Sequence, residues 1–310
     1  MMVVVRAAKR VWAWFFEERN CIFQLFYLSL LSLCYGVLVS EAWHTLDLLD
    51  RSIAIFFAFA CLGLFVRVSF VDPGVITHRN LATQQHYPDH DALYPRGRVC
   101  RTCKTLKIPR SKHCRVCNHC VARFDHQLVS CIWVNTCIAK HNYNAFFFFL
   151  VVNVCGSSHL VYLLCSVFID KMTHSLADAR NASVALLTQV LTDIILSPEN
   201  GRVAFVASLA LAVWFLVSLL LGCQMGRVYR NCTANEHFKR QRLHKEHADD
   251  VPAPTRPVAF DLSWGGVGLV DAETSLVLTA DDIERNPYDG GVLHNLCDAF
   301  NIHDRKDKTD

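Results

Sequence analysis

Long hydrophobic runs recur along the chain and indicate helices that cross a membrane. Residues 21–40 carry no charge, residues 52–71 contain one charge near their end, and residues 203–222 are again uncharged. Residues 145–169 form a further apolar run with a few polar side chains inside it. An α-helix rises about 1.5 Å per residue, so about 20 residues cross a hydrocarbon layer about 30 Å thick. The pattern therefore predicts an all-α polytopic membrane protein with four transmembrane helices.

The second and third runs contain polar side chains that are unfavourable in contact with lipid. Arg67 lies near the end of the second run, where its long side chain can reach the headgroups; a functional charge inside the membrane is the alternative. Polar groups in the third run would cost free energy against lipid, so we expect them to face other helices or a cavity. They are Asn153, Ser157, Ser158 and His159. For His159 the sequence favours helix packing over a functional role.

The distribution of basic residues orients the chain. Lysine and arginine number four before the first run, one in the first loop, eleven in the second, three in the third and eleven in the tail. Under the positive-inside rule, both termini and the long second loop are cytosolic. A glycosylation sequon at residues 181–183 falls in the third loop, which this orientation places in the lumen. The expected domains are an interfacial segment at 1–20, spans one and two at 21–71, a cysteine-rich domain at 72–144, spans three and four with a luminal loop at 145–222, and a cytosolic tail at 223–310.

Composition supports membrane embedding and argues against other classes. The 310 residues are 52% hydrophobic, which is high for a soluble domain of average composition. The formal net charge is only +3, so no basic excess favours a nucleic-acid partner. Fifteen cysteines is an odd number, and their clustering is typical of metal ligation in a reducing compartment rather than of secreted disulfides.

Seven of the fifteen cysteines lie within residues 100–137, between the second and third apolar runs. Zinc takes four ligands, and a CxxC pair supplies two thiolates from one tight turn. The pairs and their neighbouring histidines are Cys100, Cys103, His113, Cys114, Cys117, His119 and Cys120. This set offers more ligands than one ion can use, so we expect two zinc ions. A zinc module that only holds the fold together is the simplest interpretation.

The residues that follow Cys120 carry a more specific signal. Residues 123–126 read RFDH and residues 131–137 read CIWVNTC, which resembles the signature of the DHHC protein S-acyltransferases, also called palmitoyltransferases. Further similarities lie along nearly the whole chain: Asp72-Pro73-Gly74 after span two, residues 109–114 ahead of the cysteines, Asn142 and Phe146 entering span three, residues 233–236 after span four, and Asn286, Tyr288 and Gly291 in the tail. Each motif is short, but their order and placement are specific together.

The resemblance implies two interleaved structural zinc sites and a catalytic cysteine. The first site would comprise Cys100, Cys103, His113 and Cys120, and the second Cys114, Cys117 and Cys137 with one histidine. Cys131 corresponds to the catalytic cysteine, and Asp125 and His126 to the partners that activate it. In such enzymes the cysteine takes a fatty acyl group, palmitoyl above all, from acyl-CoA and passes it to membrane-proximal cysteines of substrate proteins. The spans would hold the fatty chain among membrane lipid. A base oriented by a carboxylate suits this chemistry, because it raises the thiolate fraction of the cysteine.

The chain departs from this family at the catalytic motif. Where the family has Asp-His-His-Cys, residues 125–131 read DHQLVSC, a net insertion of three. Glutamine is a poor zinc ligand, so the second site lacks its histidine. Water could complete that site, His126 could be diverted to it, or Cys131 could become its fourth ligand; the last two would silence the nucleophile. A splice junction or a gene-model error is a further hypothesis for the insertion. Smaller departures occur at Ile132, Ala139 and Ala234.

Three functions therefore compete. A membrane-bound protein S-acyltransferase leads, and a catalytically impaired relative that acts as a membrane adaptor is the alternative. A zinc-module protein without this ancestry would leave the motif matches as coincidence. Golgi, endoplasmic reticulum and plasma membrane stay open as locations. In the tail, apolar residues at helical spacing over 292–300 predict a helix that could lie on the membrane or pack on the cysteine-rich domain.

Overall fold

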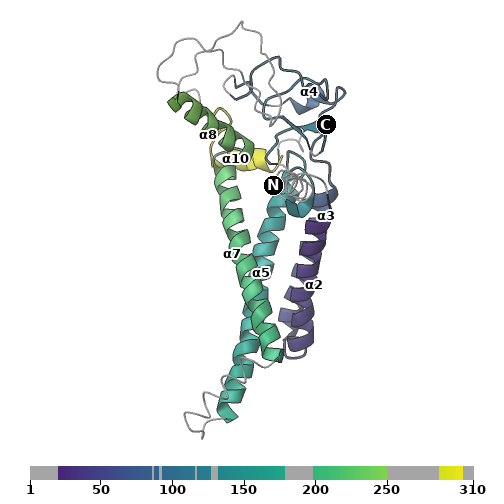
Figure 1. Ribbon diagram of the computed structural model, residues 1–310, viewed down its shortest axis with the longest axis vertical. Coiled ribbons are helices and arrows are strands. Elements are labelled where there is room, and N and C mark those ends of the chain that lie inside the picture. Colours follow the sequence, from purple (N-terminus) through teal and green to yellow (C-terminus); the bar gives the residue numbers. More distant parts are fainter. Residues whose placement is uncertain are drawn as a thin grey trace, which may run out of the picture.

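Four long helices dominate the computed structural model, which describes residues 20–85, 87–90, 93–115, 117–126, 132–178, 198–249 and 286–302 (Figure 1). The long helices are α2 (Ile22–Ala42), α3 (Leu48–Phe70), α5 (Tyr143–Asp178) and α7 (Pro198–Tyr229). All four are long and apolar enough to cross a membrane. The prediction of a four-span helical membrane protein is confirmed. The sequon and the predicted interfacial segment before Asn20 lie outside the described residues.

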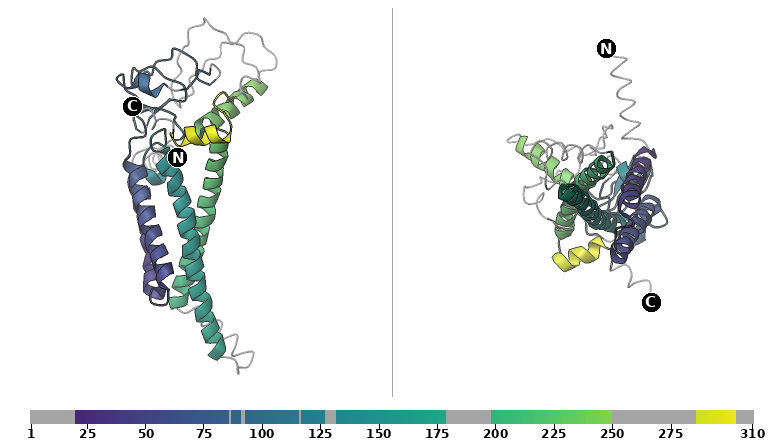
Figure 2. Two further views of the ribbon diagram at one scale, coloured as in Figure 1. Left: turned by 180° about the vertical axis from the view of Figure 1, so that it is seen from behind. Right: turned by 90° about the horizontal axis from the view of Figure 1, so that it is seen from below.

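The helices form an elongated bundle with α5 at its centre. α5 packs against both α7 and α3, and α2 packs against α7 and α5, as the view along the bundle in Figure 2 shows. One buried cluster, which includes Phe65, Phe146 and Phe149, lies near the cysteine-rich end. A second, which includes Leu38 and Leu164, lies toward the opposite end. The core is therefore divided along the length of the bundle.

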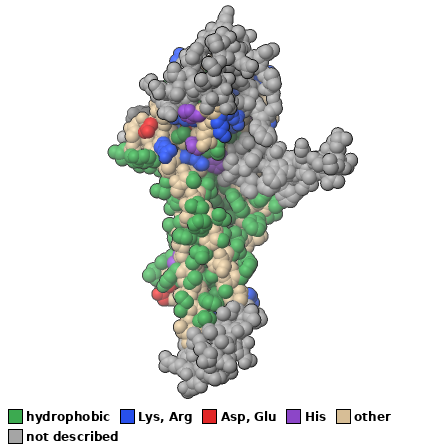
Figure 3. All heavy atoms as spheres, turned by 60° about the vertical axis from the view of Figure 1, so that its left-hand side comes forward, with side chains coloured by type: hydrophobic (Ala, Val, Ile, Leu, Met, Phe, Trp, Pro, Cys, Tyr) green, Lys and Arg blue, Asp and Glu red, His purple; other side chains and the backbone are tan. Residues whose placement is uncertain are grey.

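The outside of the bundle is apolar. Hydrophobic side chains cover the helical shaft, and lysine and arginine gather around its cysteine-rich end (Figure 3). Phe59, Phe205 and Leu216 are 71%, 64% and 64% exposed. A soluble monomer rarely exposes so continuous an apolar surface, whereas lipid tails cover it without cost.

Helix ends extend beyond the apolar runs because capping and continued helix propensity set them. α3 begins four residues before the predicted residue 52, since the Asp47 carboxylate caps it by accepting from the Asp50 amide at 2.7 Å. α7 begins at Pro198, a residue suited to the first helical position, and continues to Tyr229. α5 continues past residue 169 to Asp178.

Polar groups inside span three mostly serve helix packing, as predicted. Tyr27 of α2 donates its hydroxyl to Asn153 Oδ1 at 3.1 Å, and His159 Nε2 lies 3.2 Å from Asp50 Oδ1 of α3. Ser157 is half-buried and faces a cavity among the spans, although its hydroxyl donates to the Asn153 carbonyl of its own helix at 2.6 Å. The expectation was wrong for Ser158, which is exposed and satisfies its hydroxyl on the Val154 carbonyl of its own helix at 2.8 Å.

The cysteine-rich segment and the tail occupy one end of the bundle (Figure 1). Within this segment, β1 (Lys112–Cys114) pairs antiparallel with β2 (His119–Val121), and a short helix α4 (Leu81–Gln84) precedes them. After span four come α8 (Ala234–Asp249) and then α10 (Val292–Ala299), which packs on α7. The helix predicted over 292–300 is thus confirmed.

Candidate active site and metal centres

The first candidate metal centre brings four predicted ligands together. The ligand atoms of Cys100, Cys103, His113 and Cys120 all lie within 4.8 Å of one another. His113 Nδ1 lies 3.3 Å from Cys103 Sγ, 3.6 Å from Cys100 Sγ and 3.9 Å from Cys120 Sγ. Tetrahedral zinc, with bonds of about 2.0–2.3 Å, places neighbouring ligand atoms about 3.6 Å apart. These four residues therefore fit zinc.

The local fold explains this convergence. Cys100 and Cys103 flank a tight turn in which the Cys103 amide donates toward Cys100 Sγ at 3.5 Å, and Lys104 adopts a positive φ of 57°. The β1–β2 register sets His113 directly opposite Cys120. Burial, followed by the charges of nearby basic residues, lowers the pKa of His113. Its ring is therefore neutral at physiological pH, which is the form that binds a metal.

The second candidate centre joins Cys114 and Cys117 to Cys137, which lies just after η1 (Ile132–Val134). The three Sγ atoms lie within 4.8 Å of one another, and those of Cys117 and Cys137 are 2.8 Å apart. Hydrogen bonds from the Cys114 and Cys117 side chains raise the pKa of Cys137, so a cation is needed to hold the group as thiolates. Among the described residues this centre has three ligands; Gln127 lies outside them.

Asn142 fixes the loop that carries Cys137. The side chain is fully buried, donates from Nδ2 to the Cys137 carbonyl at 2.8 Å and accepts at Oδ1 from the Ala139 amide at 2.9 Å. These bonds hold the loop against the start of α5. The resemblance identified Asn142, and the structure gives its physical role.

The Asp72-Pro73-Gly74 turn holds the β1–β2 hairpin at the end of span two. Asp72 Oδ1 accepts from the amides of Gly74 and Val75 at 2.9 and 3.0 Å. Gly74 has a φ of +104°, and a Cβ there would meet the His141 ring at 3.4 Å. Its carbonyl accepts from the Ala122 amide at 3.0 Å. Glycine is needed here for the backbone conformation, because side chains disfavour this positive φ, whereas the distance to the His141 ring is an ordinary van der Waals contact.

Asp125 and His126 form a hydrogen-bonded pair. His126 Nδ1 lies 2.7 Å from Asp125 Oδ2, and the side chains are 8% and 4% exposed. A carboxylate oxygen only accepts, so Nδ1 carries the proton and Nε2 is the basic atom of the ring. An antiparallel bridge to Ile138 fixes the backbone of His126, and the Phe146 ring packs edge-on at 5.2 Å between centroids. The imidazole is therefore held by the Asp125 carboxylate and the Phe146 ring, on a backbone fixed by Ile138.

The N-terminus of α8 holds the Asp125 carboxylate. Asp125 Oδ1 accepts from the Ala234 amide at 2.7 Å, and the Asp125 carbonyl accepts from the Asn235 amide at 3.0 Å. Burial alone would raise the pKa of Asp125. The hydrogen bond and charge of His126, the Ala234 amide and the charge of Arg227 outweigh burial and hold that pKa below its ordinary value. Asp125 is therefore ionised, as a carboxylate at a helix N-terminus should be.

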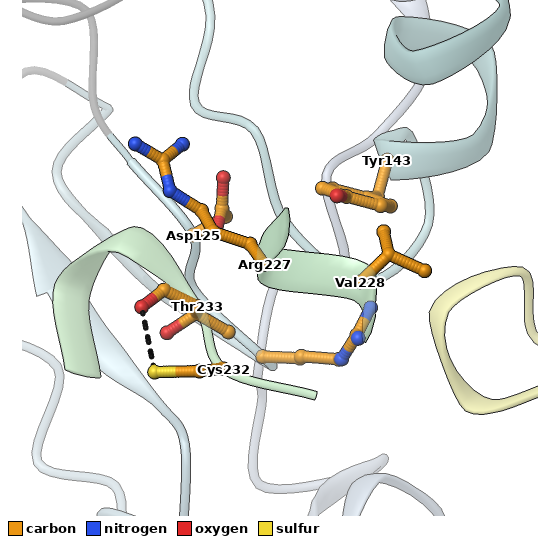
Figure 4. Close-up of a pocket in the computed structure, with 7 residues that line it drawn as sticks. Asp125, Tyr143, Arg227, Val228, Cys232 and Thr233 are labelled. Carbon is orange, nitrogen blue, oxygen red and sulfur yellow. Dashed lines mark hydrogen bonds between the residues drawn. The ribbon is translucent and has the colours of Figure 1, made fainter. Parts of the chain in front are cut away.

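A small cavity of about 10 Å³ adjoins this carboxylate; we call it the Asp125 cavity. In Figure 4 the Arg227 side chain extends from α7 past Asp125, while Tyr143 of α5 and the Cys232–Thr233 segment border other sides. Cys232 Sγ donates to the Thr233 carbonyl at 3.5 Å. The cavity thus lies where α5, α7 and the start of α8 meet the loop that carries Arg123 and Asp125.

Arg110 joins the cysteine-rich segment to α8 and the tail. Its guanidinium contacts Glu236 through Nε–Oε1 at 2.8 Å and Nη2–Oε2 at 3.0 Å, and neither side chain is exposed. Nη1 also lies 3.3 Å from Asp298 Oδ2 of α10. The rings of Tyr87 and Tyr288 both contact the guanidinium, with centroids 4.8 and 4.4 Å from Arg110 Cζ, and they meet each other edge-on at 5.7 Å between centroids. We call this group the Arg110 hub.

Glu236 has a second task within the hub. Thr233 Oγ1 accepts from the Glu236 amide at 3.2 Å, and Glu236 Oε2 accepts from the Thr233 amide at 2.9 Å. This reciprocal pair is a capping box at the start of α8. One carboxylate therefore fixes both the helix that holds Asp125 and the arginine of the hub.

Five asparagine side chains attach the last described segment of the tail, residues 286–302, to the rest of the molecule, each donating Nδ2 to a backbone carbonyl across that contact. The pairs are Asn231 to Tyr288 at 2.7 Å, Asn286 to Arg230 at 2.6 Å, Asn295 to Tyr229 at 2.7 Å, Asn144 to Phe300 at 2.7 Å and Asn301 to Lys140 at 2.6 Å. Phe300 also packs on Phe147 and Phe148 of α5. The tail is thus an integral part of the site's framework.

A second cavity, of about 60 Å³, lies among the four spans. Its walls are mostly apolar and come from every span, for example Cys34 of α2, Cys61 of α3, Gly156 of α5 and Ala210 of α7. Gly156 leaves room for the Phe57 side chain of α3, since a Cβ at position 156 would lie only 3.2 Å from it. At the cysteine-rich end of the bundle, Trp133 packs against Phe23 and Phe26 of α2 at 6.0 Å between centroids.

The structure brings most predicted site residues together. The ligands of the first centre, the three sulfurs of the second, and the Asp125–His126 pair each converge. Cys131 lies outside the described residues. Sequence reasoning missed Asn231, Asp298 and Arg227, because buried or partly buried polar residues beside the site lie far from it along the chain and carry no local spacing pattern.

Comparisons with known proteins agree with this architecture. Residues 94–241 match the family model of the DHHC palmitoyltransferases. The chain is 29% identical over 266 residues to Palmitoyltransferase ZDHHC4 of Bos taurus, a match that covers 80% of this chain and 75% of the relative. It is 32% identical over 250 residues to Palmitoyltransferase SWF1 of Yarrowia lipolytica, covering 78% and 64%. To Palmitoyltransferase ZDHHC8 of Drosophila melanogaster it is 34% identical over 165 residues, covering 47% of this chain and 16% of the relative. Since the matches take in both the spans and the cysteine-rich segment between them, the chain belongs to the DHHC palmitoyltransferase family.

Proposed function

We propose that this chain is a membrane-bound protein S-acyltransferase that moves a fatty acyl group from acyl-CoA to cysteines of substrate proteins, with Cys131 as carrier. The observation that carries the proposal is the buried Asp125–His126 pair, held on the N-terminus of α8 at the end of the bundle. An adaptor without activity would not need an ionised carboxylate fixing one tautomer of a histidine close to the predicted nucleophile in sequence. The family matches favour the enzyme as well.

In the first half-reaction His126 Nε2 takes the proton of the Cys131 thiol. The thiolate attacks the thioester carbonyl of acyl-CoA, the carbon–sulfur bond to CoA breaks, and the CoA thiolate leaves with the proton from His126. In the second half-reaction the substrate cysteine loses its proton to His126 and attacks the Cys131 thioester. Cys131 then leaves as a thiolate and recovers that proton. One thioester replaces another at each step, so the transfer is nearly balanced in free energy.

Asp125 determines which nitrogen of His126 accepts the proton. Its acceptance of the Nδ1 proton leaves Nε2 as the base, and its negative charge stabilises the imidazolium that forms when Nε2 takes a proton. The amides at the start of α8 keep the carboxylate in place. Asp125 therefore orients and stabilises the base without exchanging protons itself.

The surroundings suit an acyl-CoA molecule. Lys239, on α8, has a pKa lowered to about 7, first by burial and then by cations that include Lys112, Lys107 and Arg98. So many basic groups close together favour an anionic ligand, and the phosphates of CoA provide that charge. The apolar cavity among the spans would receive part of the fatty chain. We therefore infer acyl-CoA, with palmitoyl-CoA as the typical donor, as the small-molecule partner.

The two cysteine centres would each hold a structural zinc ion. When bound, zinc cross-links loops that few other contacts join. Cys100, Cys103, His113 and Cys120 form a closed ligand set. Cys114, Cys117 and Cys137 need one more ligand, which would be a water or a residue outside the described part of the chain. We further infer that this end of the bundle and both termini face the cytosol, following the basic residues.

Metabolic labelling with a fatty-acid probe tests the proposal. The full-length protein is immunopurified from cells fed the probe, and its label is challenged with hydroxylamine, which cleaves thioesters. We expect hydroxylamine-sensitive label that Cys131→Ser abolishes. The matched control is Cys297→Ser on α10, which keeps the wild-type label and shows that removing any tail cysteine is not enough.

Two results would count against the enzyme. The first is the absence of label on the wild type while a known family member labels in the same cells. The second is label that persists in Cys131→Ser. If the wild type is silent, deletion of residues 128–130 with Gln127→His restores the family's motif. Label on that variant assigns the silence to the insertion, and continued silence assigns the chain to the adaptor class.

A further inference from the structure

Arg227 occupies an unusual position at the end of span four. It lies in the last turn of α7, and its side chain borders the Asp125 cavity together with Asp125 and Tyr143 (Figure 4). Within the described part of the chain, no carboxylate lies within the 4.0 Å that defines an ion pair with it. Among these residues, no structural salt bridge neutralises the charge of Arg227.

The other arginine of the cavity is committed elsewhere. Arg123 Nη1 donates to the Ala299 carbonyl at 3.4 Å, and Nη2 lies 3.6 Å from Asp298 Oδ2. Among the described residues Arg123 Nε has no hydrogen-bond partner although it is buried, and the residue is only 6% exposed. A cavity of about 10 Å³ is close to the space that one water molecule needs. Polar groups around it, Asp125 included, can therefore interact across a single water.

We propose that Arg227 is a positioning residue for the acyl transfer: its charge acts across the Asp125 cavity on the Asp125–His126 pair and keeps His126 a neutral base at cytosolic pH. This rests on the proposed function. Arg227 does not touch the reacting atoms, and it acts through Asp125. The contribution of Arg227 to the low pKa of Asp125 is consistent with this role.

The sign of the effect follows from electrostatics. A nearby positive charge disfavours imidazolium, so removing it raises the pKa of His126 and moves the onset of base catalysis to higher pH. The same removal weakens any stabilisation of the Cys131 thiolate, which shifts the onset in the same direction. The charged and titratable groups that line the Asp125 cavity beside Asp125 are Arg123 of the same loop, Tyr143 of α5, Arg227 of α7 and Cys232 just before α8. Cys232 is in turn influenced by Glu236 and Arg240 of α8.

The experiment measures the pH dependence of Cys131 in the full-length protein in detergent. Two rates are followed across a pH series: self-acylation from palmitoyl-CoA, and alkylation of Cys131 by iodoacetamide, read by mass spectrometry of its peptide. The variants are Arg227→Gln, the charge-conserving Arg227→Lys, and the control Arg230→Gln. Arg230 is exposed one turn further on, and within the described part of the chain only its backbone forms hydrogen bonds, with the carbonyl accepting from Asn286.

We expect the acid limb of both profiles to move up by about one pH unit in Arg227→Gln, which lowers the rate on that limb about tenfold. Arg227→Lys should recover most of the shift, and Arg230→Gln should match the wild type. If Arg227→Gln does not accumulate, Arg227→Met is used in its place, because methionine keeps the apolar part of the arginine side chain. Zinc content and elution volume identify variants whose fold has changed.

The proposal would be overturned if the acid limbs of both pH profiles stayed unchanged in Arg227→Gln. It would also be overturned if Arg227→Lys shifted them as far as Arg227→Gln does. Alkylation does not require acyl transfer, so it separates the two hypotheses. If the wild-type protein fails to self-acylate but its Cys131 alkylation profile depends on Arg227, the enzyme is refuted while the action of Arg227 on the Asp125–His126 pair is supported. If the wild-type protein self-acylates but the acid limbs do not depend on Arg227, the enzyme is supported and the role of Arg227 is refuted.

Discussion

The Arg110 hub makes a quantitative prediction, because the same chain contains a surface ion pair of nearly equal length. Arg110 Nε lies 2.8 Å from Glu236 Oε1 with both side chains 0% exposed, whereas Arg96 Nε lies 3.0 Å from Asp89 Oδ2 with side chains 71% and 33% exposed. The paired perturbations are Glu236→Gln and Asp89→Asn. Each replaces one carboxylate by its amide and changes little in shape.

The expected magnitudes differ because burial removes water as a substitute partner. Removing one member of a buried ion pair costs about 3–5 kcal/mol, since the remaining charge stays buried. Arg110 keeps its bonds to Asn231 and its contact with Asp298, so we expect the lower end, about 3 kcal/mol. Breaking the surface pair costs at most about 1 kcal/mol.

Native-state hydrogen exchange followed by mass spectrometry measures these differences locally. The informative peptides cover the first turns of α8 and α10, where the amides of His237 and Asn295 donate to Thr233 and Gly291 at 3.0 and 2.9 Å. A loss of about 3 kcal/mol speeds their exchange roughly 100-fold where opening passes through the hub. Asp89→Asn should change it less than about fivefold.

Equal acceleration of hydrogen exchange by Glu236→Gln and Asp89→Asn would refute the reasoning, because it would mean that burial does not increase the free-energy cost of breaking an ion pair. Acceleration in α8 alone would also contradict it, since Arg110 contacts both Glu236 and Asp298 and loss of its anchor should loosen α10 as well.

Four further perturbations have defined outcomes. Asp125→Asn should lower self-acylation at least about 100-fold with zinc content unchanged, because an amide no longer enforces the Nδ1–H tautomer; near-normal label would contradict the proposed role. Gly74→Ala should lower the free energy of unfolding by at least about 1 kcal/mol, seen as a reduced midpoint in urea, since its φ of +104° disfavours any side chain. Lys239 has a folded pKa of about 7 against an ordinary value of 10.5, so the unfolded chain binds more protons between these values and stability rises with pH across that window; Lys239→Met should remove this slope in pH-dependent melting curves. Cys103→Ala and Cys117→Ala should each lower zinc by about one ion per chain by elemental analysis, and loss from only one of them would leave a single metal centre.

The spans and metal ligands could be predicted from sequence because their signals are local. A charge-free run of about 20 residues has few interpretations, and CxxC pairs define their own turns. Ends such as Asp47 and Pro198 were missed by several residues, since caps and continued helical propensity lie outside the apolar pattern. Ser158 was misassigned because its hydroxyl could be satisfied within its own helix.

The connections around the site could not be predicted, because they join residues far apart in sequence. Arg110 meets Glu236 and Asp298 across more than a hundred residues, and only burial reveals that these charges form one group. The motif around residue 233 looked like a family marker, whereas its chemistry is a capping box that also orients Asp125. Arg227 had no pattern of its own and became visible only as a wall of the Asp125 cavity.

The five asparagines that attach the tail also give the protein a chemical lifetime. In each, the group that matters is the side-chain NH₂, which faces a carbonyl at 2.6–2.7 Å. Deamidation replaces that NH₂ with a carboxylate oxygen, so a donor becomes an acceptor and attraction becomes repulsion. Because α10 carries Asp298 of the Arg110 hub, deamidation at four of these positions would loosen the framework of the Asp125–His126 pair as well as the tail. Asn286 is the exception, since Pro287 has no backbone N–H to attack its amide. Old and newly made molecules of one sequence would then differ in how firmly they hold their own C-terminal segment.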